Sequence, residues 1–165
     1  MALDAFFTQL ILNLGYFGAA LAVFLGSATL FLPTPAFILV FVMAAPQFGF
    51  SPLLLGIAAG LGATFGELVG YGIGYGSEKL ALKHYKEKLK IIEKYFERFG
   101  GGFVIFVFAI TPLPFDVVGI FCGIVGYDLK KFFAATAMGK IIKYCAITYA
   151  GFYGIAWISK LFGLG

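Results

Sequence analysis

Hydrophobic residues fill most of the chain, and prolines interrupt two of its longest hydrophobic runs. Between Ala5 and Gly66 the sequence contains no Asp, Glu, Lys, Arg or His. Pro33 and Pro35 lie inside the run from Phe31 to Ala45, and Pro112 and Pro114 lie inside the run from Phe103 to Gly126. Proline has no N–H and its ring clashes with the preceding turn, so a Pro-x-Pro unit ends a helix. The pattern predicts two apolar helices that are each broken internally.

Two other segments are long enough to cross a bilayer, which takes about 20 apolar residues. One runs from Ser51 to Gly76, with Ser51 at the N-cap and Pro52 at the first helical position. The other runs from Asp128 to Gly151, with Asp128 as the cap and Lys130 and Lys131 at the membrane interface. We expect both to be transmembrane helices.

The arms beside the prolines are too short to cross. Ala36 to Phe48 would reach about 20 Å as a helix, and Phe103 to Thr111 about 14 Å. Short arms that meet at a break are expected to form re-entrant hairpins, which enter and leave the membrane on the same side. The arm from Tyr16 to Leu32 is longer, and its length leaves open whether it crosses fully.

The two halves of the chain follow the same order. Each hairpin ends in a glycine, an aromatic residue and a capping residue, which are Gly49-Phe50-Ser51 and Gly126-Tyr127-Asp128. A helix candidate precedes each hairpin, at Asp4 to Leu14 and at Glu78 to Phe99. With one transmembrane helix per half, the second half must enter from the opposite face, as in the inverted repeats of carriers. The predicted fold is a single all-α integral membrane domain, residues 1–165, with repeat A at about 1–76 and repeat B at about 77–165.

Composition and charge agree with a multi-pass membrane protein, which we expect in a prokaryotic cell membrane. The chain is 61% hydrophobic and 12% charged, which excludes an ordinary soluble domain. Its net charge of +4 comes mostly from Glu78 to Arg98, with seven basic and four acidic residues. We expect Lys79 to Arg98 to lie on anionic headgroups. If this segment is cytoplasmic, both basic clusters obey the positive-inside rule and the N-terminus lies outside, but the absolute orientation stays open. Nucleic-acid binding is not expected, and whether copies form a homo-oligomer stays open.

Glu67 is a candidate substrate or proton site because an ionised carboxylate inside a membrane helix is costly. Tyr71 and Tyr75 follow at intervals of four residues and share its face of the helix. The structural alternative is an ion pair between Glu67 and Lys140 that pins two helices together. The two interpretations are compatible.

Asp116 and two lysines are the other candidates. Asp116 follows Pro114 inside the second hairpin, where it could cap the second arm or bind a substrate or proton. Lys140 could bind Glu67 or a phosphate headgroup, and Lys143 could face a cavity or extend towards the interface.

Other motifs indicate packing rather than chemistry. The glycines around Glu67, at positions 56, 60, 62, 66, 70 and 74, predict close approach of other backbones. Cys122 and Cys145 are expected to be buried structural thiols, and His84 to be a solvated surface residue. The sequence contains no catalytic motif and no cluster at metal-ligand spacing, so neither an enzyme, a metal nor a cofactor is expected.

Two segments resemble the DedA superfamily, whose common unit is the VTT domain. They are Ile110-Thr-Pro-Leu-Pro-Phe-Asp-Val-Val-Gly-Ile-Phe-Cys-Gly123 and Phe132-Phe-Ala-Ala-Thr-Ala-Met-Gly-Lys140. They look most like the branch that contains the eukaryotic vacuole membrane proteins. Gly62-Ala-Thr-Phe-Gly-Glu67 is similar to a glycine-and-acid element of the family's first half. The resemblance covers roughly Leu30 to Tyr144.

The resemblance implies two inverted re-entrant hairpins and movement of lipid between leaflets, with the family's acidic residues at Glu67 and Asp116. Bacterial members usually have arginines where this chain has Ala109 and Phe115. Without them an anionic phosphate loses its expected bidentate partners. The difference favours a scramblase-like activity over a lipid-phosphate carrier.

The leading hypothesis is therefore a lipid translocase with a polar furrow between the hairpins, lined by Glu67, Asp116, Lys140 and Tyr71. An alternative is a proton-coupled secondary transporter or polyprenyl-phosphate flippase that uses Glu67 and Asp116 as protonation sites. A third hypothesis is a membrane interaction module whose basic helix recruits partners.

Overall fold

A computed structural model describes residues 2–29, 36–77, 94, 96, 98–111 and 115–161. Every regular element in these ranges is helical, as the sequence predicts. The elements are α1 (Ala2–Ala28), α2 (Ala36–Met43), the 3-10 helix η1 (Pro46–Phe48), α3 (Pro52–Gly76), α5 (Gly101–Ile110), α6 (Asp116–Ile124) and α7 (Leu129–Leu161).

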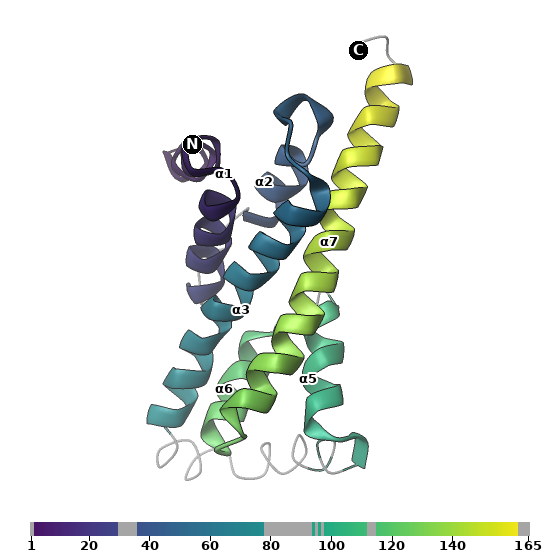
Figure 1. Ribbon diagram of the computed structural model, residues 1–165. Coiled ribbons are helices and arrows are strands. Elements are labelled where there is room, and N and C mark those ends of the chain that lie inside the picture. The colour runs from purple at the N-terminus through teal and green to yellow at the C-terminus, as the bar shows by residue number, and fades with distance from the viewer. Residues whose placement is uncertain are drawn as a thin grey trace.

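The two longest straight helices, α3 and α7, run side by side in opposite directions along the molecule (Figure 1). Glycines make their close approach possible. A Cβ at Gly56 would meet the main chain of Cys145, and a Cβ at Gly60 would meet that of Ile141. The expectation that the glycines of this segment admit other backbones is confirmed, because Gly62 and Gly66 admit α1 and Gly74 admits α6 in the same way.

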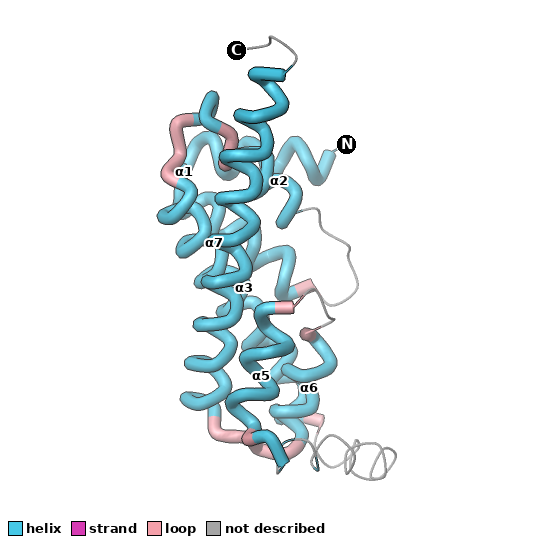
Figure 2. The backbone as a smooth tube through the Cα atoms, turned by 90° about the vertical axis from the view of Figure 1, so that its right-hand side faces the viewer, coloured by secondary structure: helices cyan, strands magenta, loops and turns pink. Residues whose placement is uncertain are grey.

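The four shorter arms surround this pair. α1 and α2 lie beside the upper half of the molecule in Figure 1, and α5 and α6 lie beside its lower half. α1 and α6 pack mainly on α3, whereas α2 and α5 pack mainly on α7. Figure 2, turned by 90°, shows the same division between the two ends.

α1 bends sharply at Gly15, so it consists of two helical pieces. Gly15 has φ 59° and ψ −131°, values that glycine adopts more readily than other residues. The next residue anchors the bend, since the Tyr16 hydroxyl accepts a hydrogen bond from the Ser51 N–H at 2.9 Å. The Tyr16 ring also packs edge-on against Phe50 at 5.4 Å. The second piece, from Tyr16 to Ala28, is only about 20 Å long.

Three sequence predictions about element bounds meet different outcomes. The predicted arm Ala36 to Phe48 is wrong in extent: α2 ends at Met43, because Pro46 lacks an N–H and starts the 3-10 turn instead. The second transmembrane candidate continues beyond Gly151, so the tail forms the end of one long helix that reaches Leu161. Pro33, Pro35, Pro112 and Pro114 lie outside the described residues, as does most of the predicted helix from Glu78 to Phe99.

Two helical segments are long and apolar enough to cross a membrane by length and composition, Phe6–Ala28 and Pro52–Gly76. The first of them includes the bend at Gly15. α7 is longer, but Lys130, Lys131, Lys140 and Lys143 reduce its apolar character. Large apolar side chains face outward at both ends of the fold, for example Phe17 of α1 at 70% exposure and Phe103 of α5 at 59%. Such a surface suits contact with lipid.

Candidate functional site

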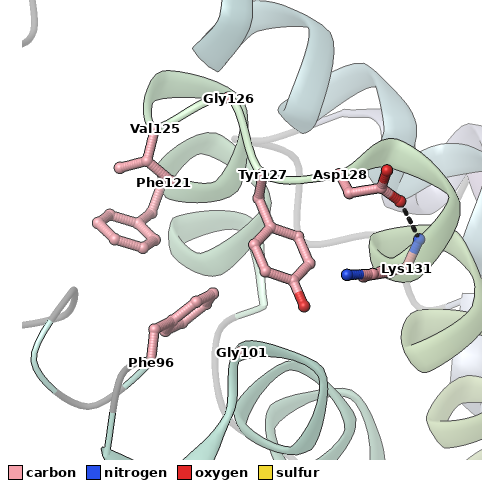
Figure 3. Close-up of a pocket in the computed structure, with 8 residues that line it drawn as sticks. All are labelled: Phe96, Gly101, Phe121, Val125, Gly126, Tyr127, Asp128 and Lys131. Atoms are coloured by element: carbon pink, nitrogen blue, oxygen red, sulfur yellow. Dashed lines mark hydrogen bonds between the residues drawn. The ribbon is translucent and has the colours of Figure 1, made fainter.

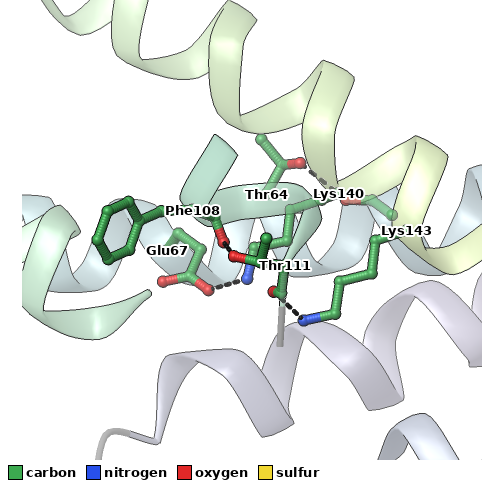
Figure 4. A network of polar contacts seen from close by, with 7 residues as sticks. Thr64, Glu67, Phe108, Thr111, Lys140 and Lys143 are labelled. Atoms are coloured by element: carbon green, nitrogen blue, oxygen red, sulfur yellow. Dashed lines mark hydrogen bonds and ion pairs between the residues drawn. The ribbon is translucent and has the colours of Figure 1, made fainter. Parts of the chain in front are cut away.

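A buried ion pair joins the two long helices. The Lys140 Nζ donates to the Glu67 Oε1 at 2.5 Å, across 73 residues of sequence (Figure 4). Glu67 is 4% exposed and Lys140 is 6% exposed. The contact that the sequence offered as a structural role for Glu67 is therefore present. Because each charge would be costly alone in these surroundings, the pair holds α3 and α7 in register.

Small residues bring further helices to the same point. A Cβ at Gly139, the residue before Lys140, would meet the Ala109 side chain and the main chain of α5 at Phe106. On the other side of α3, Gly119 of α6 lies against the Glu67 carbonyl, where a Cβ would stand 3.5 Å from the oxygen. The ion pair therefore lies where α3, α5, α6 and α7 converge.

The residues that flank the second proline break contact the lysines of α7. The Lys140 Nζ lies 4.6 Å from the centroid of the Phe115 ring, immediately before α6. The Lys143 Nζ donates a hydrogen bond to the Thr111 carbonyl at 3.1 Å, at the end of α5. Figure 4 shows Lys143 extending from α7 to Thr111, beside the contact between Lys140 and Glu67. One lysine thus contacts the end of α5, and the other contacts the residue before α6.

Asp116 lies near this cluster, and its charge interacts with that of Glu67. The interpretation of Asp116 as a helix cap is wrong, because α6 begins at Asp116 itself and Phe115 occupies the N-cap position. Its half-buried carboxylate still lies in the first turn of α6, where a negative charge is favourable next to free N–H groups. No side-chain hydrogen bond caps α6, so Asp116 stays a candidate binding residue.

Tyr71 lies one turn beyond Glu67 on α3 and makes a different contact. Its hydroxyl donates to the Tyr127 carbonyl at 2.5 Å, and its ring packs on Phe132 at 5.1 Å. Tyr71 therefore ties α3 to the turn between α6 and α7. Tyr75, on the same face, is 64% exposed.

Sequence reasoning missed the roles of Thr111 and Phe115. Thr111 also donates its hydroxyl to the Val107 carbonyl at 2.9 Å, which closes the last turn of α5. Both residues adjoin the Pro-x-Pro unit, and this position in the sequence could have indicated them. No sequence pattern indicates Thr64, whose buried hydroxyl donates to the Gly60 carbonyl at 2.7 Å, one turn before Glu67. Thr136, one turn before Lys140, is fully buried, and its hydroxyl makes no hydrogen bond in the described part of the chain.

The cluster offers one negative and two positive groups to any polar molecule that reaches it. An incoming anion could replace Glu67 as the partner of Lys140, and an incoming cation could replace Lys140 as the partner of Glu67. Either exchange would separate α3 from α7 at this point. The arrangement suits reversible binding of a charged group inside the membrane.

Comparison with known proteins places this geometry in a family. Residues 32–153 match the VTT domain, a range that includes both proline breaks and the Glu67–Lys140 pair. The chain is also similar to an uncharacterized protein of Methanocaldococcus jannaschii, with 32% identity over 142 residues, 84% of this chain and 85% of that protein. No solved structure matches. The chain belongs to the VTT-domain family of membrane proteins, the DedA family.

Proposed function

We propose that this protein is a lipid translocase, which moves phospholipid headgroups between leaflets in the manner of a scramblase. The observation that carries the proposal is the buried Glu67–Lys140 pair at the convergence of four helices. In this structure the pair is closed, since both side chains are almost inaccessible. Translocation requires the furrow lined by Glu67, Asp116, Lys140 and Tyr71 to open.

The chemistry of a phospholipid headgroup matches the pair. A zwitterionic headgroup carries a phosphate that can bind Lys140 and an ammonium that can bind Glu67, so both charges keep a partner while the helices separate. Unassisted passage leaves the headgroup without partners in hydrocarbon, at a cost of several kcal/mol for each unsatisfied polar group. Exchange of partners in the furrow lowers this barrier.

An inverted repeat with two re-entrant hairpins would let the furrow open to either side, and several local features support it. The four glycines with positive φ in the described residues fall into two pairs, Gly15 with Gly100 before the hairpins and Gly49 with Gly126 after them. Each half also contributes one short helix that packs on the long helix of the other half. The first arm of each half packs on its own long helix, as α1 on α3 and α5 on α7, whereas the second arm packs on the other long helix, as α6 on α3 and α2 on α7.

On this proposal the domain comprises repeats of about 1–76 and 77–165, and it crosses the cell membrane of a prokaryote several times. Membrane lipids are its partners, with anionic headgroups under Lys79 to Arg98. The similarity of Pro112-Leu-Pro-Phe-Asp116 to the vacuole-membrane-protein branch favours the scramblase-like activity.

Reconstituted vesicles test the proposal. A fluorescent phospholipid is placed in both leaflets and the outer leaflet is quenched with dithionite, which reports exchange between leaflets. We expect Glu67→Gln and Lys140→Gln to slow exchange by about tenfold, which corresponds to roughly 1.4 kcal/mol in the barrier. Lys160→Gln, a matched change at an exposed position on the same helix as Lys140, should leave the rate unchanged. Unchanged exchange in both site variants would remove the pair from the mechanism.

A second candidate is a proton-coupled transporter of a small solute or of a polyprenyl phosphate. The nearness of the Asp116 and Glu67 charges favours it, because a proton-coupled transporter needs acidic groups along its path. A pH gradient separates the two functions. The rate of scramblase-like exchange does not depend on the pH gradient. A coupled transporter uses the gradient to accumulate its substrate on one side of the membrane.

A further inference from the structure

The start of α7 borders two adjacent hollows that share one wall. The first is a pocket of about 450 Å³ between the end of α6 and the start of α5 and α7. The second is a groove of about 620 Å³ along α5 and α7. Gly101, Tyr127 and Lys131 line both, so the two hollows meet at these residues.

The first hollow is polar on one side and aromatic on the other. Figure 3 shows Tyr127, Asp128 and Lys131 opposite Phe96 and Phe121, whose rings pack edge-on at 5.1 Å. The Asp128 Oδ1 accepts a hydrogen bond from the main-chain N–H of Lys131 at 2.8 Å. This bond caps α7 and fixes the position of the Lys131 backbone. Burial raises the pKa of the Tyr127 phenol, so its hydroxyl stays a neutral hydrogen-bond donor.

The second hollow is lined mainly by small and apolar residues. Gly100 precedes α5, Gly101 and Gly102 begin it, and Ala134 and Ala135 line the groove from α7. Phe103 and Met138 form exposed walls, at 59% and 60% exposure. From Lys131 to Met138 the groove follows α7 for about 10 Å.

The double hollow has a charged end and an apolar end, as a lipid in one leaflet has a headgroup and acyl chains. Its charged end lies at the first turn of α7, beside the exposed residues Lys130 and Lys131, which we expect to lie at the membrane interface. Its apolar end lies about two turns deeper along the same helix. A soluble anion would use only the polar end, and the long apolar groove would stay unexplained.

We propose that this double hollow binds one phospholipid, with its phosphate on Lys131 and the Tyr127 hydroxyl and one acyl chain in the groove between α5 and α7. The role of the site as the place where lipid waits before crossing rests on the proposed translocase function. Lipid binding at this site does not rest on that function, because it is measured without a leaflet assay. Loss of binding and loss of translocation are therefore separate results.

The binding experiment uses the full chain in detergent and a phosphatidylglycerol with a fluorescent acyl chain, followed by anisotropy. Lys131→Gln should weaken binding about fivefold, the effect of one exposed charge contact. Lys130→Gln is the matched control: it removes a neighbouring exposed lysine that lines neither hollow, and it should leave the affinity unchanged. A diacylglycerol with the same fluorescent chain, which has no phosphate, should bind the wild type and Lys131→Gln equally.

A second pair of variants tests the groove. Ala134→Trp fills it from an exposed position, and we expect binding to fall by at least fivefold. Ala150→Trp places the same bulk at an exposed position of α7 outside the groove and should have no effect. Glycerol phosphate, which has the headgroup without a chain, should not compete.

The proposal is overturned if Lys130→Gln weakens binding as much as Lys131→Gln, since the lysines then act only through surface charge. It is also overturned if Ala134→Trp binds normally or if glycerol phosphate competes as well as the phospholipid. Circular dichroism of each variant, equal to that of the wild type, is required before its affinity is compared.

Discussion

Lys143 donates a hydrogen bond to the main-chain carbonyl of Thr111, 3.1 Å away, and thereby binds the last turn of α5 to α7. The final carbonyls of a helix have no partner within the helix, and the helix dipole makes that end negative. A half-buried ammonium stabilises it. On the other side of the proline break Lys140 makes a cation–π contact with the Phe115 ring. Opening of the furrow requires these contacts to be exchanged.

Removal of the Lys143 ammonium should loosen the end of α5. We expect Lys143→Met to lower the free energy of unfolding by about 1 kcal/mol, below the usual value for a charged hydrogen bond because the site is half exposed. Hydrogen exchange at Val107 to Thr111 should become faster. Lys160→Met, at the exposed end of α7, serves as the control and should change neither quantity. Equal hydrogen-exchange rates in the two variants would show that the Lys143 contact does not restrain the end of α5.

The Glu67–Lys140 pair should show strong coupling in stability. Loss of one partner leaves an uncompensated buried charge, so Glu67→Gln or Lys140→Met alone should lower the free energy of unfolding by about 3 kcal/mol. The double variant removes both charges and should recover most of that loss. Thermal unfolding in detergent gives the coupling energy. Additive losses would mean that the two side chains do not act as a pair.

The same double variant separates stability from function. A pair that only pins two helices together predicts normal leaflet exchange once stability is recovered. A pair that exchanges partners with a headgroup predicts slow exchange in a stable protein, because neither charge is present. We expect the second result.

The glycines that admit α7 should tolerate no added methyl group. Gly60→Ala places a Cβ against the main chain of Ile141, and we expect a loss of about 1–3 kcal/mol from overpacking. Gly72→Ala is the matched control on the same helix, where a Cβ meets nothing within 4 Å. It should be neutral or gain about 0.5–1 kcal/mol from helix propensity. Equal melting temperatures for the two variants would contradict the packing described.

Sequence reasoning succeeded where a local rule was sufficient. The glycine spacing of α3 predicted close packing, and Pro52 and Asp128 predicted helix starts, because each depends on the backbone chemistry of a few neighbouring residues. It also proposed the contact between Glu67 and Lys140, since two opposite charges in apolar sequence have few other partners.

Tertiary contacts decided the rest. The shortened α2 follows from Pro46, a local signal that was not used. The bend at Gly15 agrees with the predicted division between Asp4 to Leu14 and the arm from Tyr16. Its anchoring depends on where Tyr16 meets Ser51, and the Lys143 contact depends on where α5 ends. α7 extends to Leu161, and its lysines Lys140 and Lys143, which lower its apolar character, find partners in the fold. Apart from the end of α2 and the position of the bend, no pattern within one segment predicts these features.

Cysteine accessibility in intact cells tests the central claim most directly, which is that two hairpins enter the membrane from opposite faces. Single cysteines at Gln9, Gln47 and Val125, all exposed, replace the native residues in a chain that lacks Cys122 and Cys145. We predict that a membrane-impermeant maleimide labels positions 9 and 47 from one face and position 125 only from the other. Labelling of 9 and 47 from opposite faces, or of 47 and 125 from the same face, would contradict the account.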